Sequence, residues 1–424
     1  MTRVRESLFN RTDPLRIGEA EPAYSPDAGL PASADSTAEP SIVSESEEWI
    51  AIRRHLHRYP ELSGEEYETT AYLRERLENL GIRIVDYGLE TGLVAEIGSG
   101  EGPIAALRAD IDALPIEEET GLEYASTRPG RMHACGHDFH AAVLIGAAQL
   151  LKRREAELPG TVRLLFQPAE ERAKGARQLI QAGVLQGVGA VIGQHNKPDL
   201  PVGTIGITAG PIMAASDGFT VTVRGTASHA AVPEAGIDPI VTAAHIVTAL
   251  QTITGRSISA QERAVVSVTQ VHAGNTWNVI PDTAVLQGTI RSFDESVHSR
   301  IKERFAEIAG GVASAFGAEA SVRWSGGPPP VVNDAALTAL AGICAHGLGL
   351  RVAEGITSPA SEDFSFYQQQ VPGVFLFVGT SGDREWHHPA FELNDAALPG
   401  AASLLAELAV RTLLHLSETV EEEA

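Results

Sequence analysis

The chain has 424 residues, of which 43% are hydrophobic and 21% charged, a composition typical of a folded protein with room for two domains. Its formal net charge of −23 argues against nucleic acid and anionic membrane surfaces as partners, because both bind basic faces. Two cysteines give no basis for a disulfide framework. We find no run of 18 apolar residues and no secretory signal, and we therefore expect a cytoplasmic protein without a membrane span.

The first part of the chain differs in composition from the rest. Residues 1–46 are rich in Pro, Ser, Ala, Asp and Glu and poor in large apolar residues, which predicts a disordered or loosely attached extension. From Glu47 onward, apolar residues recur at helical spacing and predict a helix that ends near Tyr59. A second amphipathic helix is expected from Thr69 to Leu80.

Four short apolar runs then predict buried strands. The runs are 104–107, 162–166, 190–193 and 374–379, and helical segments at 141–154 and 173–185 lie between the first three. This order predicts an α/β domain with a mostly parallel sheet covered by helices on both faces. Acidic or histidine side chains follow each run, namely Asp110, Asp112, Glu170, Glu171, His195, His387 and His388. Ligands of such sheets bind beyond the carboxyl ends of the strands, so we expect these side chains to share one site.

The residues 132–140 contain three histidines, a cysteine and an aspartate. Thiolate and imidazole both bind zinc and related divalent metals, so Cys135 and His137 are candidate ligands. Two other interpretations remain at this point. Cys135 could be a buried apolar residue among hydrogen-bonded histidines, or it could be a nucleophile activated by His137.

Residues 213–327 follow a different pattern, with strands and helices in the order β-α-β-β-α-β. This order predicts an inserted α+β domain of the ferredoxin-like type. The first domain would then consist of residues 47–212 and 328–424. An open sheet with helices on one face leaves edge strands that need cover, so we expect the inserted domain to carry a homodimer contact.

The motifs of residues 47–424, taken together and in order, resemble the amidohydrolase branch of the di-metal aminoacylase and carboxypeptidase superfamily, peptidase family M20. The matching motifs are Arg-Ala-Asp-Ile-Asp-Ala-Leu-Pro at 108–115, Met-His-Ala-Cys-Gly-His-Asp at 132–138, Gln-Pro-Ala-Glu-Glu at 167–171, His-Ala-Ala at 229–231, Asn-Val-Ile-Pro-Asp at 278–282, Ser-Glu-Asp-Phe at 361–364 and His-His-Pro at 387–389. The resemblance implies a metal-dependent hydrolase that cleaves the amide bond of N-acyl-amino acids.

The resemblance also implies the roles of individual residues. It implies two divalent metal ions, zinc or manganese among others, held by Cys135, His137, Glu171, His195 and His387. Asp112 would orient a ligand, and Glu170 would be the general base for the attacking water. His229 of the inserted domain, a lid and dimerisation domain, would stabilise the oxyanion from its own chain or from a partner subunit. Asn278 and Arg291 would bind the substrate carboxylate, although Arg291 is also compatible with an exposed cross-strand partner.

Some alternatives stay open from the sequence. Glu170 and Glu171 could exchange roles, because a strand end does not fix which carboxylate faces the metal. The chain has Pro233-Glu234 where the family usually has Pro-His, which leaves the lid-side substrate contacts undefined. A catalytically silent member that binds or senses a ligand, and a dipeptidase or carboxypeptidase specificity, are the rival functions.

Overall fold

The computed structural model describes residues 42–423, with side chains from 45 to 418. The expected extension of residues 1–46 lies mostly outside this range. Helix α1 spans Ile42–Arg58 and begins five residues before the expected start, and α2 spans Tyr67–Asn79. Trp49, Ile52 and Leu56 of α1 are buried, as their helical spacing predicts.

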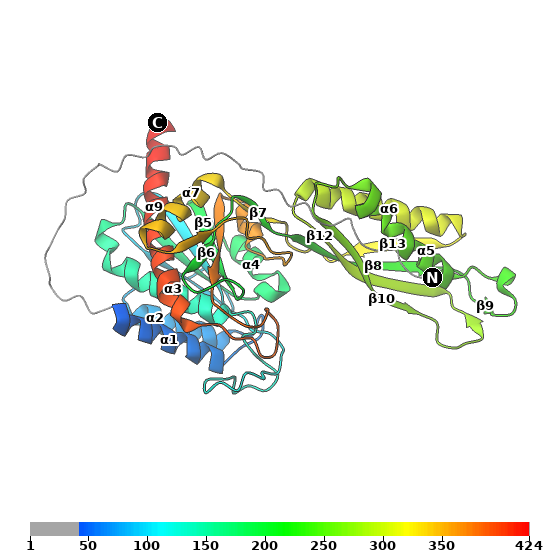
Figure 1. The fold of residues 1–424 in the computed structure, drawn as a ribbon, viewed down its shortest axis with the longest axis horizontal. Helices are drawn as coiled ribbons and strands as arrows, with labels where there is room; N and C mark the ends of the chain where they lie inside the picture. Colours follow the sequence, from blue (N-terminus) through cyan, green and yellow to red (C-terminus); the bar gives the residue numbers. More distant parts are fainter. Residues whose placement is uncertain (1–41, 424) are drawn as a thin grey trace, which may run out of the picture. The chain divides into compact units, whose positions relative to one another are not determined.

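The largest sheet has eight strands, and its central strands are parallel (Figure 1). The four strands β4-β3-β5-β16 lie side by side, and each neighbouring pair runs parallel. Towards one edge β2 and β1 pair antiparallel; towards the other, β6 is antiparallel to β16 and β15 is parallel to β6. In sheet order the strands are β1 (Arg83–Val85), β2 (Leu93–Ile97), β4 (Thr161–Gln167), β3 (Ile104–Asp110), β5 (Val188–Lys197), β16 (Gly373–Gly379), β6 (Thr204–Gly206) and β15 (Arg351–Ala353).

Helices cover both faces of this sheet, which confirms the predicted α/β class. Alternate residues of β3 belong to different cores, because successive side chains of a strand point to opposite faces. Ala105 and Leu107 pack in the core that includes α1, α3, α7 and α9, whereas Ala106 packs in the core that includes α4 and α8. The bounds of these helices are α3 His137–Arg153, α4 Gly175–Gln181, α7 Ala335–Gly347, α8 Ser365–Gln368 and α9 Leu398–Glu423.

The C-terminal helix is the one described helix that is long and apolar enough to cross a membrane. The qualifying segment is Asp395–Glu418, and 67% of its most apolar window is buried inside the fold. Leu405, Leu408 and Leu413 belong to the same core as α1 and α3. Its apolar character is therefore explained by packing against the sheet and its neighbouring helices.

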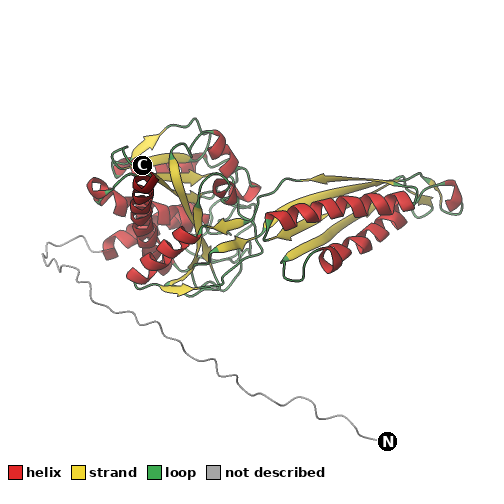
Figure 2. Ribbon diagram, turned by 90° about the horizontal axis from the view of Figure 1, so that it is seen from above, coloured by secondary structure: helices red, strands yellow, loops and turns green. Residues whose placement is uncertain are grey.

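The inserted residues form a four-stranded antiparallel sheet with two helices on one face (Figure 2). The chain order of the six elements is the predicted β-α-β-β-α-β, and the strand order in space is β13-β8-β12-β10. The six elements are β8 (Ala215–Arg224), α5 (Pro239–Leu250), β10 (Ala264–Ala273), β12 (Thr283–Ser292), α6 (Glu295–Ala315) and β13 (Glu319–Trp324). Asp238 caps the start of α5, since it accepts hydrogen bonds from the N–H groups of Ile240 and Val241.

Two short pairs of strands complete the fold. The segments that lead into and out of the inserted sheet pair with each other as β7 (Gly210–Met213) and β14 (Val331–Asn333). Within the inserted part, β9 (Ser228–His229) pairs antiparallel with β11 (Val279–Ile280). This second pair joins the two segments that carry His229 and Asn278, because the N–H of Ala230 donates to the carbonyl of Asn278.

Candidate active site

The five residues that the sequence marks as metal ligands lie together at the carboxyl ends of the parallel strands. Donor atoms of Cys135, His137 and His195 lie within 4.8 Å of one another, and so do those of Cys135, Glu171 and His387. The two groups share the Cys135 sulfur. One donor set of sulfur, imidazole and carboxylate atoms therefore comes from four separate segments of the chain.

A glycine turns the chain so that Cys135 and His137 face the same site. Gly136 has φ +84, a left-handed conformation that glycine adopts without strain. A Cβ atom at Gly136 would approach Asn196 Nδ2 to 2.4 Å, so the position has no space for a larger residue. Helix α3 begins at His137 directly after this turn. The sequence Cys-Gly-His thus delivers a thiol and an imidazole to one point.

A second unusual turn presents the two adjacent glutamates. The single 3₁₀ turn Glu170–Arg172 lies between Ala169 (φ 52) and Ala173 (φ 49), both in the left-handed region. Non-glycine residues in that region are strained, and such strain occurs at functional sites where the surrounding structure stabilises it. Here the stabilising contacts include the backbone N–H groups of Glu170 and Glu171, which each donate to Asp112 across 3.1 Å.

Asp112 links the strand end to both the imidazole and the glutamate turn. Besides the two N–H groups, it accepts a hydrogen bond from the Ser63 hydroxyl at 2.6 Å. Its Oδ1 lies 3.2 Å from Nδ1 of His137, so the His137 Nδ1–H donates to the carboxylate. This contact directs Nε2 of His137 towards the other candidate ligands. An orienting contact of this kind is usual for histidines that bind metals.

The other two imidazoles are oriented in a comparable way. His195 Nδ1 donates to the carbonyl of Asn196 at 2.8 Å, and its Nε2 lies 3.5 Å from the Cys135 sulfur. His387 Nε2 lies 3.4 Å from Glu171 Oε1. The neighbouring His388 instead accepts a hydrogen bond from the Ala390 N–H through Nδ1. Of the two adjacent histidines, His387 is therefore the one whose ring faces the donor set.

Two buried atoms at the centre of the site have no hydrogen-bond partner among the described residues. They are His137 Nε2 and Glu171 Oε1, which lie 3.9 Å apart. Burial lowers the pKa of His137, but the facing carboxylates of Asp110 and Asp112 outweigh it and raise that pKa to about 10. The surroundings thus favour a cation at Nε2. Buried polar atoms without partners are costly, and a bound divalent metal would satisfy both atoms.

The thiol and the glutamates point to the same need for a cation. Burial raises the pKa of the Cys135 thiol well above its ordinary value of 9.0, and the carboxylates of Glu171 and Glu170 raise it further. Burial also raises the pKa of Glu170 well above 4.5, and the nearby Glu362 and Glu171 add to that increase. A thiolate among carboxylates becomes stable only beside positive charge. The donor set therefore fits a pair of divalent metal ions.

A buried arginine network lies beside the glutamates, and sequence reasoning assigned it no role. Arg108 donates to Asp110, Glu362 and Asp363 at 2.8–3.0 Å. The backbone N–H of Asp363 donates to Glu170 Oε1 at 3.3 Å. Glu362 and Asp363 come from the Ser-Glu-Asp-Phe motif, so the motif itself was the available signal. The Asp363 N–H of this motif therefore holds one carboxylate oxygen of Glu170 in place.

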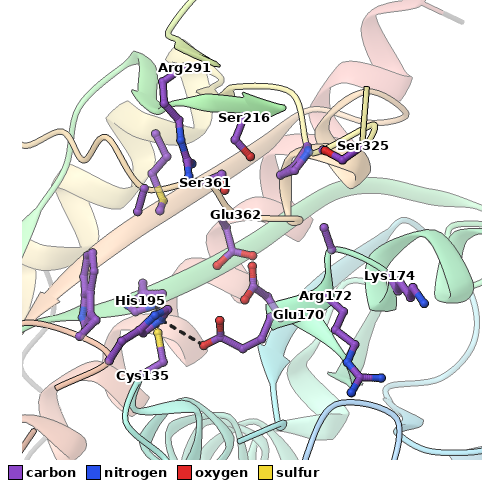
Figure 3. Close-up of a pocket in the computed structure, with 18 of the residues that line it drawn as sticks. Cys135, Glu170, Arg172, Lys174, His195, Ser216, Arg291, Ser325, Ser361 and Glu362 are labelled. Atoms are coloured by element: carbon purple, nitrogen blue, oxygen red, sulfur yellow. Dashed lines mark hydrogen bonds and ion pairs between the residues drawn. The ribbon is translucent and has the colours of Figure 1, made fainter. Parts of the chain in front are cut away.

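The donor set opens into a cavity of about 470 Å³ (Figure 3). Cys135, Glu170 and His195 line it from the large sheet, and Arg291 lines it from strand β12. Figure 3 shows the Arg291 side chain pointing towards Ser361. Further lining residues that the sequence did not single out are Arg172, Lys174, Arg177, Met213, Ser216, Ser325 and Trp386.

Asp112 and His137 are buried and do not line this cavity, and two predicted substrate contacts do not line it either. His229 and Asn278 are absent from the lining residues, and His229 is exposed on the short β9–β11 pair. The two residues are nevertheless close to each other, because the Ala230 N–H bonds to the Asn278 carbonyl. Within one described chain, the predicted substrate contacts are therefore divided between the cavity and a separate exposed site.

Comparison with known proteins agrees with the geometry. The model of peptidase family M20/M25/M40 matches residues 106–411. The chain belongs to this family. As an M20 protein it is 52% identical over 365 residues to an N-acetyl-L-cysteine deacetylase of Bacillus subtilis (strain 168), a match that covers 86% of this chain and 88% of that protein.

Further relatives of this M20 chain support the same class. An Arabidopsis thaliana protein, IAA-amino acid hydrolase ILR1-like 4, is 40% identical over 378 residues, covering 87% of this chain and 86% of that protein. A solved Bacillus subtilis structure, described as a dinuclear metal binding peptidase from the M20 family, has a TM-score of 0.80 and 47% identity. That match covers 88% of this chain and 99% of the solved chain. The protein is a hydrolase that acts on amide bonds.

Proposed function

We propose that the protein hydrolyses the amide bond of N-acyl-amino acids at a pair of divalent metal ions. The observation that carries the proposal is the pair of unpartnered buried atoms, His137 Nε2 and Glu171 Oε1, among sulfur, imidazole and carboxylate donors. Relatives named as an N-acetyl-L-cysteine deacetylase and an IAA-amino acid hydrolase support the substrate class. Their names differ in the acyl group, so the acyl specificity needs its own test.

The proposed ligands are Cys135, His137, Glu171, His195 and His387. Thiolate and imidazole suit zinc, whereas carboxylate also suits manganese, so both metals are candidates. When bound, a metal pair lowers the pKa of a water molecule and polarises the substrate carbonyl. Asp112 keeps the His137 ring in one tautomer through its contact with Nδ1.

Glu170 is the proposed general base, and its contacts separate it from Glu171. Glu171 Oε1 lies 3.9 Å from His137 Nε2 and 3.4 Å from His387 Nε2, as expected for a ligand. Glu170 Oε1 instead accepts a hydrogen bond from the Asp363 N–H. A buried carboxylate with a raised pKa accepts a proton readily. Glu170 takes a proton from the attacking water and passes it to the leaving amine.

Arg291 is proposed to bind the substrate carboxylate. It is only partly exposed, and one of its guanidinium nitrogens is buried without a partner in the described chain. Burial lowers the pKa of Arg291, which reflects the absence of a neighbouring carboxylate. On the adjacent strands it lies opposite Val265 and Ser216, which offer no opposite charge. A substrate carboxylate would supply the missing charged partner.

A homodimer is proposed, with residues 213–327 as the lid and dimerisation domain and residues 47–212 and 328–424 as the catalytic domain. Most of the large apolar side chains that are exposed in residues 45–418 belong to the inserted part. They are Val232, Ile240, Val241, Val265, Val271, Trp277, Val279 and Phe316. Exposed apolar residues gathered in this way favour a protein contact. In the dimer, His229 and Asn278 of one chain would complete the site of the other chain.

Mixed dimers test this arrangement. We expect His229→Ala and Glu170→Gln homodimers to be inactive, because each lacks one group at both sites. A mixed dimer would regain one complete site if His229 acts across the interface, since one site then combines an intact Glu170 with an intact His229. Mixtures that stay inactive after subunit exchange, or a fully active monomer in light scattering, contradict the proposal.

A substrate screen tests the function itself. After loading with Zn²⁺ or Mn²⁺, the enzyme is assayed with acetyl-, benzoyl-, long-acyl- and indole-acetyl-amino acids, and with unblocked dipeptides. We expect turnover of at least one acylated class, with loss on chelation and recovery on adding metal. Turnover of dipeptides alone supports the carboxypeptidase rival, and activity that survives chelation but not thiol alkylation supports the thiol mechanism. A protein that binds metal and hydrolyses nothing is the silent alternative.

The cytoplasmic location stays a prediction, which cell fractionation would test.

A further inference from the structure

Asn196 follows His195 at the end of β5 and is fully buried. It is not among the proposed ligands, yet both polar atoms of its side chain are hydrogen-bonded. Its Nδ2 donates to the carbonyl of Cys135 at 2.6 Å and to His140 Nε2 at 3.0 Å. Its Oδ1 accepts a hydrogen bond from Trp386 Nε1 at 3.1 Å. An amide group offers two donors and one acceptor oxygen, and each of them has a partner here.

These contacts allow only one orientation of the amide. If the oxygen and nitrogen exchanged places, the oxygen would face the Cys135 carbonyl and the nitrogen would face the Trp386 N–H. Both contacts would then join like groups, which no rotation of the neighbours corrects. His140 is fixed as well, because its Nδ1 donates to Asp110 at 2.6 Å while its Nε2 accepts from Asn196. The buried network is thus satisfied in one arrangement.

The same residue connects the segments that carry three of the proposed ligands. Its side chain bonds to the carbonyl of Cys135, its own carbonyl accepts from His195 Nδ1, and Trp386 is the neighbour of His387. The Trp386 ring also packs edge-to-face on His195, with centroids 4.6 Å apart.

The turn at Gly136 gives independent support for the role of Asn196 in connecting these segments. A Cβ atom there would meet the Asn196 amide nitrogen at 2.4 Å, so the turn after Cys135 is shaped around that side chain. The loop that carries His387 is also tied directly to the same turn, since the His387 N–H donates to the Ala134 carbonyl at 2.8 Å. Among the described residues, the Asn196 side chain is the one that hydrogen-bonds to the Cys135 segment and to the Trp386 side chain at the same time.

We propose that Asn196 is a positioning residue that sets the spacing of Cys135, His195 and His387 for metal binding. The inference rests on the proposed ligand set. It does not require that the substrate be an N-acyl-amino acid, because metal affinity is measured without substrate. Partners of this kind typically change metal affinity by about 10–100-fold when they are altered.

The variant Asn196→Asp isolates the positioning effect. It keeps the shape of the side chain but replaces the Nδ2 donor with an oxygen that faces the Cys135 carbonyl. By charge alone, an added carboxylate would strengthen the binding of a divalent cation. Weaker binding in this variant therefore reports the displaced ligands rather than the altered charge.

The chain offers a matched control in Asn333, which is also a buried asparagine with a saturated side chain. Its Nδ2 donates to the carbonyls of Thr208 and Phe375 at 3.0 and 2.9 Å, and its Oδ1 accepts from the Phe375 N–H at 2.8 Å. Asn333→Asp thus disrupts a similar set of hydrogen bonds that involves none of the proposed ligands. We therefore expect Asn333→Asp to lower the stability of the fold without moving the proposed metal ligands.

The experiment measures Zn²⁺ affinity by competition with a chelator, alongside the thermal unfolding midpoint of the metal-free proteins. We expect Asn196→Asp to bind Zn²⁺ about 10–100-fold more weakly than wild type. Asn333→Asp should stay within about twofold of wild type in Zn²⁺ affinity. Both variants should unfold at a lower temperature than wild type. Wild-type affinity in Asn196→Asp, or an equal loss in Asn333→Asp, overturns the proposal.

A milder variant keeps the test decisive if Asn196→Asp does not fold. Trp386→Phe retains the ring edge against His195 and removes only the hydrogen bond to Asn196 Oδ1. We expect it to weaken Zn²⁺ binding by several-fold, and unchanged affinity would count against the positioning role. If the wild-type protein binds Zn²⁺ but hydrolyses no acylated substrate, the proposed function is contradicted. The positioning role of Asn196 is then still supported by the difference in Zn²⁺ affinity between the variants.

Discussion

Replacing Glu170 by glutamine removes a proton acceptor while preserving the size of the side chain. Glutamine keeps an Oε1 atom, so it can still accept the hydrogen bond from the Asp363 N–H. The proposed ligand Glu171 is left intact, and its Oε1 remains the oxygen that faces His137 and His387. We therefore expect Glu170→Gln to retain wild-type metal content while turnover falls by about 10²–10⁴-fold, the usual contribution of a general base.

That loss corresponds to about 3–6 kcal/mol of transition-state stabilisation, at about 1.4 kcal/mol for each factor of ten. The structure also predicts an opposite effect on folding. Burial raises the pKa of Glu170 above 4.5, and Glu362 and Glu171 raise it further, so its ionised form destabilises the metal-free fold. The fold loses stability as pH rises from the unfolded pKa towards the higher folded pKa. The metal-free variant should therefore unfold at a higher temperature than wild type at pH 7, with little difference near pH 4.

The assay compares Glu170→Gln with Glu171→Gln in turnover, bound metal and metal-free unfolding temperature. Glu171→Gln should lose metal as well as activity, because a ligand oxygen becomes a neutral amide. Two variants that exchange these outcomes would mean that the glutamates have exchanged roles. Hydrolysis by Glu170→Gln at the wild-type rate would refute the mechanism.

Two other predictions concern metal binding and stability. Cys135→Ala should lose bound metal and activity together, as measured by elemental analysis and turnover; full metal content with abolished turnover would favour a thiol nucleophile. Burial raises the pKa of Asp217, but hydrogen bonds from His298 and Lys302 outweigh it and hold that pKa well below 3.8. Asp217 therefore stabilises the fold above the unfolded pKa, and this contribution is lost as pH falls through the folded pKa. Asp217→Asn should unfold at a lower temperature than wild type at pH 7, and the gap should narrow below about pH 4.

The sequence predicted the fold well because its signals are local. The spacing of apolar residues in α1 and the apolar runs of β3, β4, β5 and β16 each depend on a few adjacent residues. The three-residue strands β1, β6 and β15 were not predicted, since three residues give too short a pattern for periodicity to be visible. The start of α1 was placed at Glu47 rather than Ile42, because the polar residues before Glu47 carry no apolar period.

The site residues also divide into those with a local sequence signal and those without one. Glu171, His195 and His387 were visible because they follow predicted strands, where the fold class itself brings residues together. Cys135 and His137 were visible because residues 132–140 concentrate metal-binding side chains. Glu362 and Asn196 were not assigned roles, because their contacts join residues that are far apart in sequence. Arg108 bonds to Glu362 across 254 positions, and Asn196 bonds to Trp386 across 190. A single asparagine or glutamate gives no sign of such a partner until the chain is folded.

The choice between metal and thiol chemistry follows from the charges around Cys135. A free thiolate nucleophile would need a nearby cation to lower its pKa, as in cysteine hydrolases. Here burial and the carboxylates of Glu171 and Glu170 raise the pKa of the thiol instead. The imidazole at 3.5 Å belongs to His195, and burial holds the pKa of that imidazole well below 6.5, so it stays neutral and supplies no charge. A bound divalent cation would stabilise the thiolate in these surroundings, and the same cation would satisfy the unpartnered atoms of His137 and Glu171.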